Sequence, residues 1–267
     1  MRQKALIWLF VAAACIPAAI AQEQPSYVQQ FCVKAVAGKL SSLDAMIPDV
    51  AKVMQVRIEE GQLTFFAALK AVIPAGASAR CDYALSYGYT GFPPEPRTRE
   101  QAEATFRKAK VAGTYAEMLA KRDATSMLVS DDLWRGVTDG MAGPGSVKGS
   151  YVRLNLYKSK PGHTIAEWAK MEVEGWKPFA EALAKETPGF GWRAESLTMP
   201  AGSSLHYNAM TVDIFPNWAA TGHGYSAEMW NKVHPDLKSS DYLAKVNEVV
   251  DRYKVELYRT VEVVRKN

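Results

Sequence analysis

Two segments of the sequence repeat one pattern, and this repeat limits the fold more than any other feature. Tyr27-Val28 opens the first segment, and Tyr151-Val152 opens the second segment 124 positions later. Further matches follow in the same order, with offsets that drift by only about one or two positions. Chance matches would not stay in order over such a length, so the sequence predicts an internal duplication. The further matches are Lys34 with Lys158, Gly38 with Gly162, Pro74-Ala75-Gly76 with Pro200-Ala201-Gly202, Tyr83 with Tyr207, Phe92-Pro93 with Phe215-Pro216, and Asp132-Leu133-Trp134-Arg135 with Glu256-Leu257-Tyr258-Arg259.

The second copy indicates the element order β-α-β-β-α-β. Residues 151–157 alternate between apolar and polar side chains, which predicts a strand with one covered face. Thr164 and Glu167 have the spacing of a capping box, in which the two side chains satisfy the first free amides of a helix. The remaining elements are a helix that continues to Lys185, strands over 191–199 and 205–215 around the turn at Pro200, a helix over 241–252 and a last strand over 255–264.

The first copy predicts the same order. Its elements are a strand over 27–36, a helix between Ser41 and Gly61, two strands that flank Pro74-Ala75-Gly76, a helical region capped by Thr98 and Gln101, and a strand around 128–137. The glycine-rich stretch 140–146 is typical of a connector. We therefore expect a first repeat over 25–139, a linker over 140–149 and a second repeat over 150–267.

The predicted order is that of the ferredoxin-like unit, and two such units in one chain resemble the dimeric α+β barrel superfamily. The segment Tyr157-Lys158-Ser159-Lys160-Pro161-Gly162, followed by a helix with Glu167-Trp168, resembles the opening of NIPSNAP-like and antibiotic-biosynthesis-monooxygenase-like members. The resemblance implies an α+β fold in which two repeats form a pseudo-dimeric barrel within a monomer. It does not fix the reaction, because the superfamily includes cofactor-free oxygenases, haem-degrading enzymes, small decarboxylases and members without an established activity.

The first twenty-one residues have the three parts of a secretory signal peptide. Arg2 and Lys4 precede a short apolar stretch, which ends in Ala19-Ile20-Ala21 before Gln22. The apolar stretch is shorter than the roughly 20 residues of a membrane-spanning helix. The sequence therefore predicts a secreted or periplasmic protein without a membrane span after cleavage. The alternatives are an uncleaved anchor and a lipoprotein attached at Cys15.

Charge and cysteine content narrow the partners and the compartment. Removal of Arg2 and Lys4 leaves 30 of the 32 basic residues against 28 acidic ones, a balance that argues against a nucleic-acid partner. Cleavage leaves two cysteines, Cys32 and Cys81, which in an exported protein form either a disulfide or two buried thiols. In the ferredoxin-like arrangement their strands are antiparallel neighbours, which favours the disulfide.

Standard catalytic signatures are missing from the sequence. It contains no G-x-S-x-G, H-E-x-x-H, Walker A loop, G-x-G-x-x-G or C-x-x-C. The four histidines have no spacing that places two on one helix face, so we predict neither a metal site nor a cofactor. A haem-degrading member would need an axial ligand, for which His206 and His163 are the candidates.

Strand parity supplies the candidate ligand-binding residues. If Val152, Leu154 and Leu156 contact the helices, the alternate side chains face the open side of the sheet, which becomes the interior of a barrel. There Arg153 could hold an anion, and His206 or Tyr157 could exchange a proton. The candidate residues are Arg153, Asn155, Tyr157, His206 and Asn208. The simpler interpretation is that they face water or form a satisfied polar layer.

Two functions follow from this pattern. The first is an exported protein that binds a small molecule in a duplicated α+β barrel. The alternative is a cofactor-independent monooxygenase or isomerase that acts on a small aromatic or carbonyl compound. A water-poor cavity lined by the candidate residues would favour the enzyme, whereas a filled barrel would favour the binding protein.

Overall fold

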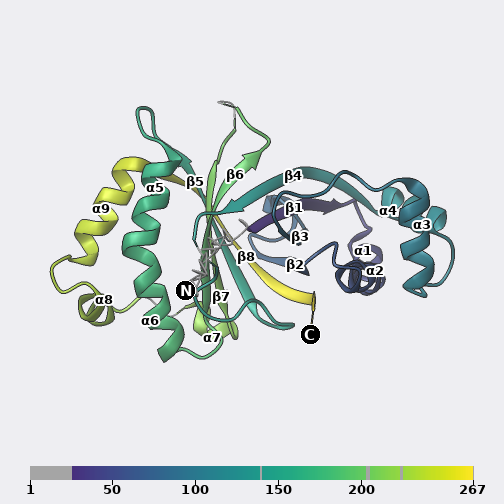
Figure 1. Cartoon of the computed structure of the whole chain (residues 1–267). Coiled ribbons are helices and arrows are strands. Elements are labelled where there is room, and N and C mark those ends of the chain that lie inside the picture. Colours follow the sequence, from purple (N-terminus) through teal and green to yellow (C-terminus); the bar gives the residue numbers. More distant parts are fainter. Residues whose placement is uncertain (1–25, 139, 203–204, 223–224, 267) are drawn as a thin grey trace, which may run out of the picture.

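A computed structural model of the chain describes residues 26–138, 140–202, 205–222 and 225–266. The predicted signal peptide and Cys15 lie outside the described residues. The fold is a mixed α+β structure in which eight antiparallel strands form a closed barrel. Figure 1 shows the strands between two groups of helices, α1 to α4 on one side and α5, α6, α8 and α9 on the other.

The first half of the chain forms four strands and four helices. They are β1 (Ser26–Ala35), α1 (Leu40–Asp44), α2 (Ile47–Glu59), β2 (Phe65–Ile73), β3 (Tyr83–Thr90), α3 (Arg99–Lys108), α4 (Tyr115–Thr125) and β4 (Ser126–Gly136). The capping box predicted at the start of α3 is confirmed, because Thr98 and Gln101 exchange both hydrogen bonds. Helix α4 was not predicted, although Thr114 and Glu117 form a second capping box before it.

The second half repeats the alternation with more helical segments. They are β5 (Tyr151–Ser159), α5 (Ile165–Met171), a π-helical turn (Glu172–Trp176), α6 (Lys177–Glu186), β6 (Gly191–Met199), β7 (Ala209–Phe215), α7 (Trp218–Thr221), α8 (Ala227–Val233), α9 (Ser239–Val249) and β8 (Val250–Arg265). The capping box of Thr164 and Glu167 is confirmed at α5. Strand β7 begins four residues later than predicted, at Ala209 rather than 205.

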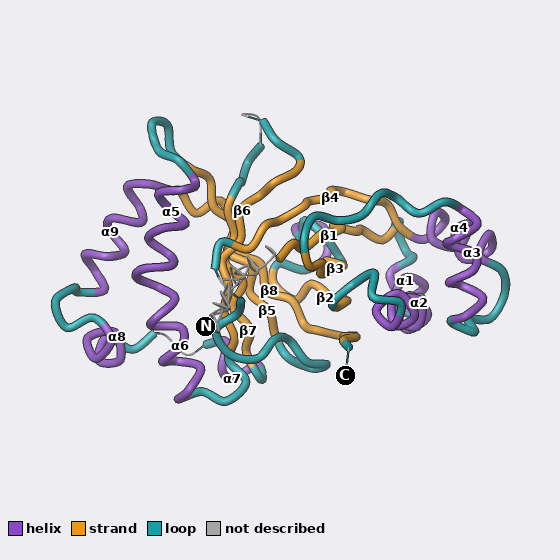
Figure 2. Tube along the Cα trace, in the orientation of Figure 1, coloured by secondary structure: helices purple, strands orange, loops and turns teal. Residues whose placement is uncertain are grey.

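The barrel is closed by pairing between the two halves. Around it the strands follow the order β1-β3-β2-β8-β5-β7-β6-β4. Strands β1 to β4 are therefore neighbours, as are β5 to β8, while the antiparallel pairs β2–β8 and β4–β6 join the two groups. Figure 2 shows the same arrangement, with the strands in the middle and the helices outside.

The interior of the barrel combines an apolar core with a few buried polar side chains such as Asp132 and Glu256, but the predicted polar face of β5 does not form it. Val152, Leu154 and Leu156 pack there against residues of the first half such as Trp134. The alternate residues of β5 face the helices instead, since Tyr157 packs with Trp168 and Phe179 in a separate cluster. The parity of β5 was predicted correctly, but its two faces were exchanged.

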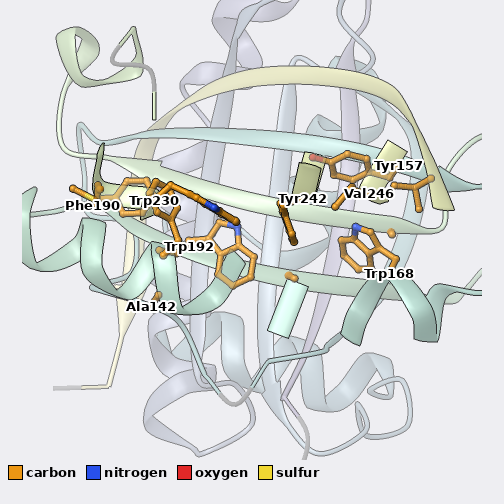
Figure 3. Packing of buried hydrophobic residues seen from close by; sticks show 14 of the residues in the cluster. Ala142, Tyr157, Trp168, Phe190, Trp192, Trp230, Tyr242 and Val246 are labelled. Atoms are coloured by element: carbon orange, nitrogen blue, oxygen red, sulfur yellow. The ribbon is translucent and has the colours of Figure 1, made fainter. Parts of the chain in front are cut away.

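Aromatic side chains fill most of the layer between the second half's strands and its helices. Trp168, Trp192 and Trp230 are buried there, as expected for helix-to-sheet packing. In the view of Figure 3, Tyr242 lies between the group around Trp230 and the group around Trp168. An equivalent layer in the first half is formed by residues of α1, α2, β2 and β3.

The predicted disulfide is confirmed. Cys32 and Cys81 are bonded, with their Cα atoms 5.1 Å apart and both side chains fully buried. The bond joins β1 to the segment that leads into β3, and these two strands pair directly. No helix among the described residues is both long and apolar enough to cross a bilayer.

Candidate functional site

A cavity of about 90 Å³ lies between the second half's sheet and its helices. We call it the sheet–helix cavity. Its sheet wall consists of Arg153, Asn155, Tyr157, Thr211 and Asp213, and its helix wall consists of Glu172, Trp176, Tyr242 and Val246. Tyr225, Leu243, Asn247 and Arg252 complete its lining, and each of these four side chains is exposed, so the cavity opens to solvent beside them.

The sheet wall is a hydrogen-bonded polar network. Asn155 donates from Nδ2 to Thr211 Oγ1 and to Asp213 Oδ2, both at 3.0 Å. Arg153 Nε lies 3.4 Å from Asp213 Oδ2, and the guanidinium carbon lies 4.6 Å from the centre of the Phe215 ring. These contacts follow from register, because β5 and β7 pair Arg153 with Asp213 and Asn155 with Thr211. Asp213 is therefore a fixed, partnered carboxylate.

Arg153 keeps one donor atom without a partner. Its Nη2 is buried and has no hydrogen-bond acceptor among the described residues. A buried donor without an acceptor costs about 1–3 kcal/mol. Because Arg153 lines the cavity, an oxygen atom of a bound molecule would remove this cost.

The helix wall is shaped by the π-helical turn at Glu172–Trp176. Such turns interrupt α-helices and occur frequently at functional sites. Gly175 lies within the turn, and a Cβ atom there would overlap the Tyr242 ring. The glycine therefore allows α9 to lie close against the turn, with Glu172, Trp176 and Tyr242 on one wall.

Aromatic rings make this wall flat and apolar. The Trp176 ring stacks on Tyr242 at 6.1 Å and meets Tyr225 edge to face at 4.9 Å. Beyond it, Trp176 also contacts Phe179 at 5.2 Å. Planar rings favour such offset and edge contacts with another aromatic group. The cavity thus places a polar sheet wall opposite an aromatic helix wall.

Glu172 is a buried carboxyl group on the aromatic wall. Glu172 is only 5% exposed. Burial raises the pKa of Glu172 to about 8, and the nearby charge of Asp213 also raises it; together they outweigh Trp168 and Arg252, which lower it. At neutral pH the group is therefore mostly protonated, and it can donate a hydrogen bond.

The other titratable groups of the cavity are held in one state. Burial raises the pKa of Tyr157 to about 12 and raises the pKa of Tyr242 further. Tyr225 is 37% exposed as a residue, but burial of its phenol group and the charge of Asp213 raise its pKa. These three phenols remain protonated at neutral pH. Burial raises the pKa of Asp213 as well, but Arg153 and Asn155 act in the opposite direction.

Three of the five candidate residues predicted from the sequence lie together. Arg153, Asn155 and Tyr157 line the sheet–helix cavity. His206 is exposed and stacks on Tyr253 with ring centres 5.4 Å apart. The side chain of Asn208 instead binds the end of β5, where its Oδ1 accepts from the Ser159 amide at 3.0 Å. His206 and Asn208 do not line the cavity, because β7 starts only after them.

Neither nominated haem ligand lies in the cavity. His163 is an exposed residue before α5, with Nδ1 3.4 Å from Glu167 Oε2. Within the described ranges, no three histidine, cysteine, aspartate or glutamate side chains are grouped as metal ligands.

Two residues that line the cavity were missed from the sequence, although a signal for each was present. Glu172 falls one helical turn after Trp168 and one turn before Trp176, on the stripe that packs against the sheet. Asp213 is a charged residue in the otherwise apolar strand β7 and shares the parity of Thr211. In both cases the signal is a carboxyl side chain at a position where the helix or strand pattern predicts burial.

Apart from Gln29, the first half carries aromatic and aliphatic side chains where the second half has this polar wall. Strands β1 and β3 pair Gln29 with Tyr87 and Phe31 with Leu85. By the offset of 124 positions predicted from the sequence, Gln29 and Phe31 correspond to Arg153 and Asn155. Phe31 and Tyr87 contact each other edge to face at 5.2 Å. The polar wall is therefore a specific property of the second half.

Comparison with known proteins identifies the fold. No family model and no curated protein matches the sequence. A "putative monooxygenase" from Lactobacillus acidophilus has a similar structure, with a TM-score of 0.52, 10% identity, and coverage of 91% of this chain and 97% of that one. A "putative monooxygenase" from Fusobacterium nucleatum is also similar, with a TM-score of 0.53, 9% identity, and coverage of 91% of this chain and 95% of that one. An "anthrone oxidase-like protein" has a TM-score of 0.45 and 12% identity, with coverage of 91% of this chain and 94% of that one. The likeness is one of fold.

Proposed function

We propose that this protein binds a small aromatic or carbonyl compound in the sheet–helix cavity. The observation that carries the proposal is that Arg153, whose buried Nη2 has no acceptor among the described residues, lines a cavity whose opposite wall is aromatic. An oxygen atom of the ligand accepts from Arg153, and its planar part packs against Trp176 and Tyr242. Pockets for small molecules commonly combine an apolar lining with a few placed polar groups.

The cavity has room for part of such a ligand, and its charges suit one. A volume of about 90 Å³ exceeds by several fold the 10–15 Å³ or so that one water needs. The opening beside Leu243 and Arg252 lets part of a ligand extend toward solvent. With Asp213 paired to Arg153 and Glu172 protonated, the exposed guanidinium of Arg252 gives the mouth a positive charge, which favours neutral or anionic ligands.

Binding can be tested with the purified protein and defined probes. Native mass spectrometry of protein from its own host would detect a co-purifying molecule, and calorimetry with phenylpyruvate and 2-naphthoate would measure affinity directly. We expect Arg153→Ala to weaken binding by roughly 10- to 100-fold, the value of a hydrogen bond to a charged group. Arg259→Ala is the matched control, because Arg259 is exposed on β8. Equal affinity in both variants, or no binding of either probe, contradicts the proposal.

Glu172 favours a second candidate function, a cofactor-independent monooxygenase or isomerase. A carboxyl group with a pKa of about 8 can both take and return a proton near neutral pH. The two fold neighbours described as "putative monooxygenases" are compatible with the oxygenase form. In that form O₂ converts a CH₂ group of the substrate to a carbonyl group and releases one water. Oxygen uptake with 2-tetralone, measured with an electrode, tests it; absence of uptake removes the oxygenase form.

We also propose that the protein is exported and is built from two ferredoxin-like repeats. The disulfide between Cys32 and Cys81 supports an oxidising compartment. N-terminal sequencing of the exported protein should begin at Gln22, and a chain that retains Met1 would contradict export. The matching strand order of the two halves supports repeats over 25–139 and 150–267. An experimental structure without a pseudo-twofold axis along the barrel would contradict the duplication.

A pseudo-dimeric barrel closed within one chain would behave as a monomer that binds no nucleic acid. Light scattering coupled to size exclusion should give a mass near that of one mature chain. A dimer mass would show that the barrel surface carries a further interface. Fluorescence polarisation with a labelled oligonucleotide at low salt should show no binding, because Lys and Arg are nearly balanced by Asp and Glu.

A further inference from the structure

We propose that Glu172 is a catalytic acid–base residue that interconverts the keto and enol forms of an aromatic carbonyl compound bound in the sheet–helix cavity. The inference rests on the proposed binding function and names its chemistry. The substrate class is a carbonyl compound with an acidic C–H group next to the carbonyl carbon and an aromatic ring beyond it.

The position of Glu172 is the first argument. The π-helical turn places its carboxyl group on the aromatic wall of the cavity, where it is buried and faces the polar sheet wall. A buried carboxyl group on an apolar wall costs stability, and such groups are found disproportionately at functional sites. A ring that packs on Trp176 and Tyr242 would bring the neighbouring C–H group of the substrate to the same wall.

The second argument is the division of roles among the charged groups. Arg153 and Asn155 fix Asp213 on the sheet wall, so this carboxylate is not free to exchange a proton. Arg153 retains its unpartnered Nη2, which can donate to a carbonyl oxygen as negative charge develops there. The cavity therefore holds a proton acceptor on one wall and a stabiliser of the enolate oxygen on the other.

The proton affinity of Glu172 supports this role. The groups that face it are Asp213 on β7, Tyr157 on β5, Arg252 on β8, Tyr242 on α9 and Tyr225 in the loop before α8. Burial and the charge of Asp213 raise the pKa of Glu172, the Trp168 indole and Arg252 lower it, and the result is about 8. A general base is most effective when its pKa lies near the working pH, because it can then both accept and return the proton.

The reaction needs no oxidant or cofactor. The Glu172 carboxylate removes the proton from the carbon next to the carbonyl group, and the C–H electron pair forms the C=C bond. The carbonyl π electrons move to oxygen, which accepts a hydrogen bond from Arg153. Protonated Glu172 then returns the proton to that oxygen, giving the enol, or to carbon, giving back the ketone. Atoms and charge balance, and Glu172 ends as it began.

Phenylpyruvate is the probe, because it combines an aromatic ring, an oxygen-rich end and a CH₂ group next to a carbonyl. In D₂O, loss of the CH₂ proton signal by NMR reports proton exchange at carbon, and calorimetry reports binding. We expect the wild-type protein to accelerate exchange over buffer, and the rate to rise with pH as Glu172 loses its proton near pH 8.

The decisive variant is Glu172→Gln, which keeps the shape of the side chain. We expect its affinity for phenylpyruvate to stay within about threefold while exchange falls by roughly 100-fold or more. Glu174→Gln is the matched control, because Glu174 lies in the same turn but is exposed. Glu172→Asp, which retains an acid, should recover part of the rate if Gln proves poorly folded by circular dichroism.

The outcomes separate the two proposals. Binding without accelerated exchange overturns the acid–base role and leaves the binding function in place. Undiminished exchange in folded Glu172→Gln, or an equal loss in Glu174→Gln, also overturns it. Absence of phenylpyruvate and 2-naphthoate binding in calorimetry defeats the binding function itself.

Discussion

Arg80 Nε lies 3.3 Å from Glu256 Oε2 inside the barrel, although 176 positions separate the two residues. Arg80 also pairs with Asp132 at 3.5 Å and donates to the Tyr207 hydroxyl at 3.2 Å. Glu256 and Tyr207 belong to the second half, and Arg80 and Asp132 to the first. A buried ionic network therefore joins the two halves of the chain inside the barrel.

Removal of the cation from this network should destabilise the protein. Arg80→Met would leave Asp132 and Glu256 buried with less compensating charge, and breaking a buried pair costs about 3–5 kcal/mol. Lys254, 3.3 Å from Glu256 Oε1, remains, so we expect the lower part of that range. Urea unfolding followed by circular dichroism measures the change.

The control for this prediction is Arg99→Met. Arg99 pairs with Glu103 on the surface of α3, and its side chain is 73% exposed. Exposed pairs contribute less than about 1 kcal/mol. If both variants unfold at the same urea concentration, the barrel network does not hold the halves together.

Breaking the disulfide should also lower stability. Cys32 and Cys81 enclose a loop with a sequence separation of 49. Loss of a bond that closes such a loop costs about 2–4 kcal/mol, chiefly because the unfolded chain gains freedom. Cys32→Ser with Cys81→Ser should lower the melting temperature relative to the oxidised protein. In the chain that lacks Cys15, thiol labelling without reductant should find no free cysteine; two labelled thiols would contradict the bond.

Strand parity was predictable from the sequence, but the identity of the two faces was not. Residues 151–157 alternate as expected, yet Leu154 lies inside the barrel and Asn155 faces the helices. Both faces of β5 are covered, one by the opposite strands and one by helices. Alternation alone cannot distinguish a covering sheet from a covering helix layer, and the polar face was assigned to the wrong one.

Local signals located the elements, whereas the cavity needed three-dimensional information. Capping boxes such as Thr164 with Glu167 are read within four positions, and they were correct. The disulfide followed from the pairing of neighbouring strands. Glu172 and Tyr242 meet only because α9 packs against the π-helical turn, and no sequence spacing encodes that contact.

Stability should depend on pH through Glu172. The pKa of Glu172 is 4.5 for a free glutamate, which represents the unfolded chain, and about 8 in the folded protein. Between pH 4.5 and pH 8 the folded state therefore binds more protons than the unfolded state. The free energy of unfolding therefore decreases as pH rises from about 5 to 9, by up to about 5 kcal/mol from this group. Urea titrations at several pH values should show a smaller decrease in Glu172→Gln. Identical pH profiles for the two proteins would mean that Glu172 is not buried as a neutral acid.

The close contact between Gly175 and Tyr242 gives a test of the cavity wall that leaves every polar group in place. In Gly175→Ala the new methyl group would overlap the Tyr242 ring and displace α9 from the turn. Overpacking of this kind costs about 1–3 kcal/mol. We expect lower stability and weaker phenylpyruvate binding, because Trp176 and Tyr242 no longer form one flat wall. Gly222→Ala is the control, because the nearest atom to a Cβ there is the Ala219 carbonyl oxygen at 3.7 Å. If Gly175→Ala binds phenylpyruvate as tightly as Gly222→Ala does, the aromatic wall is not part of the binding site.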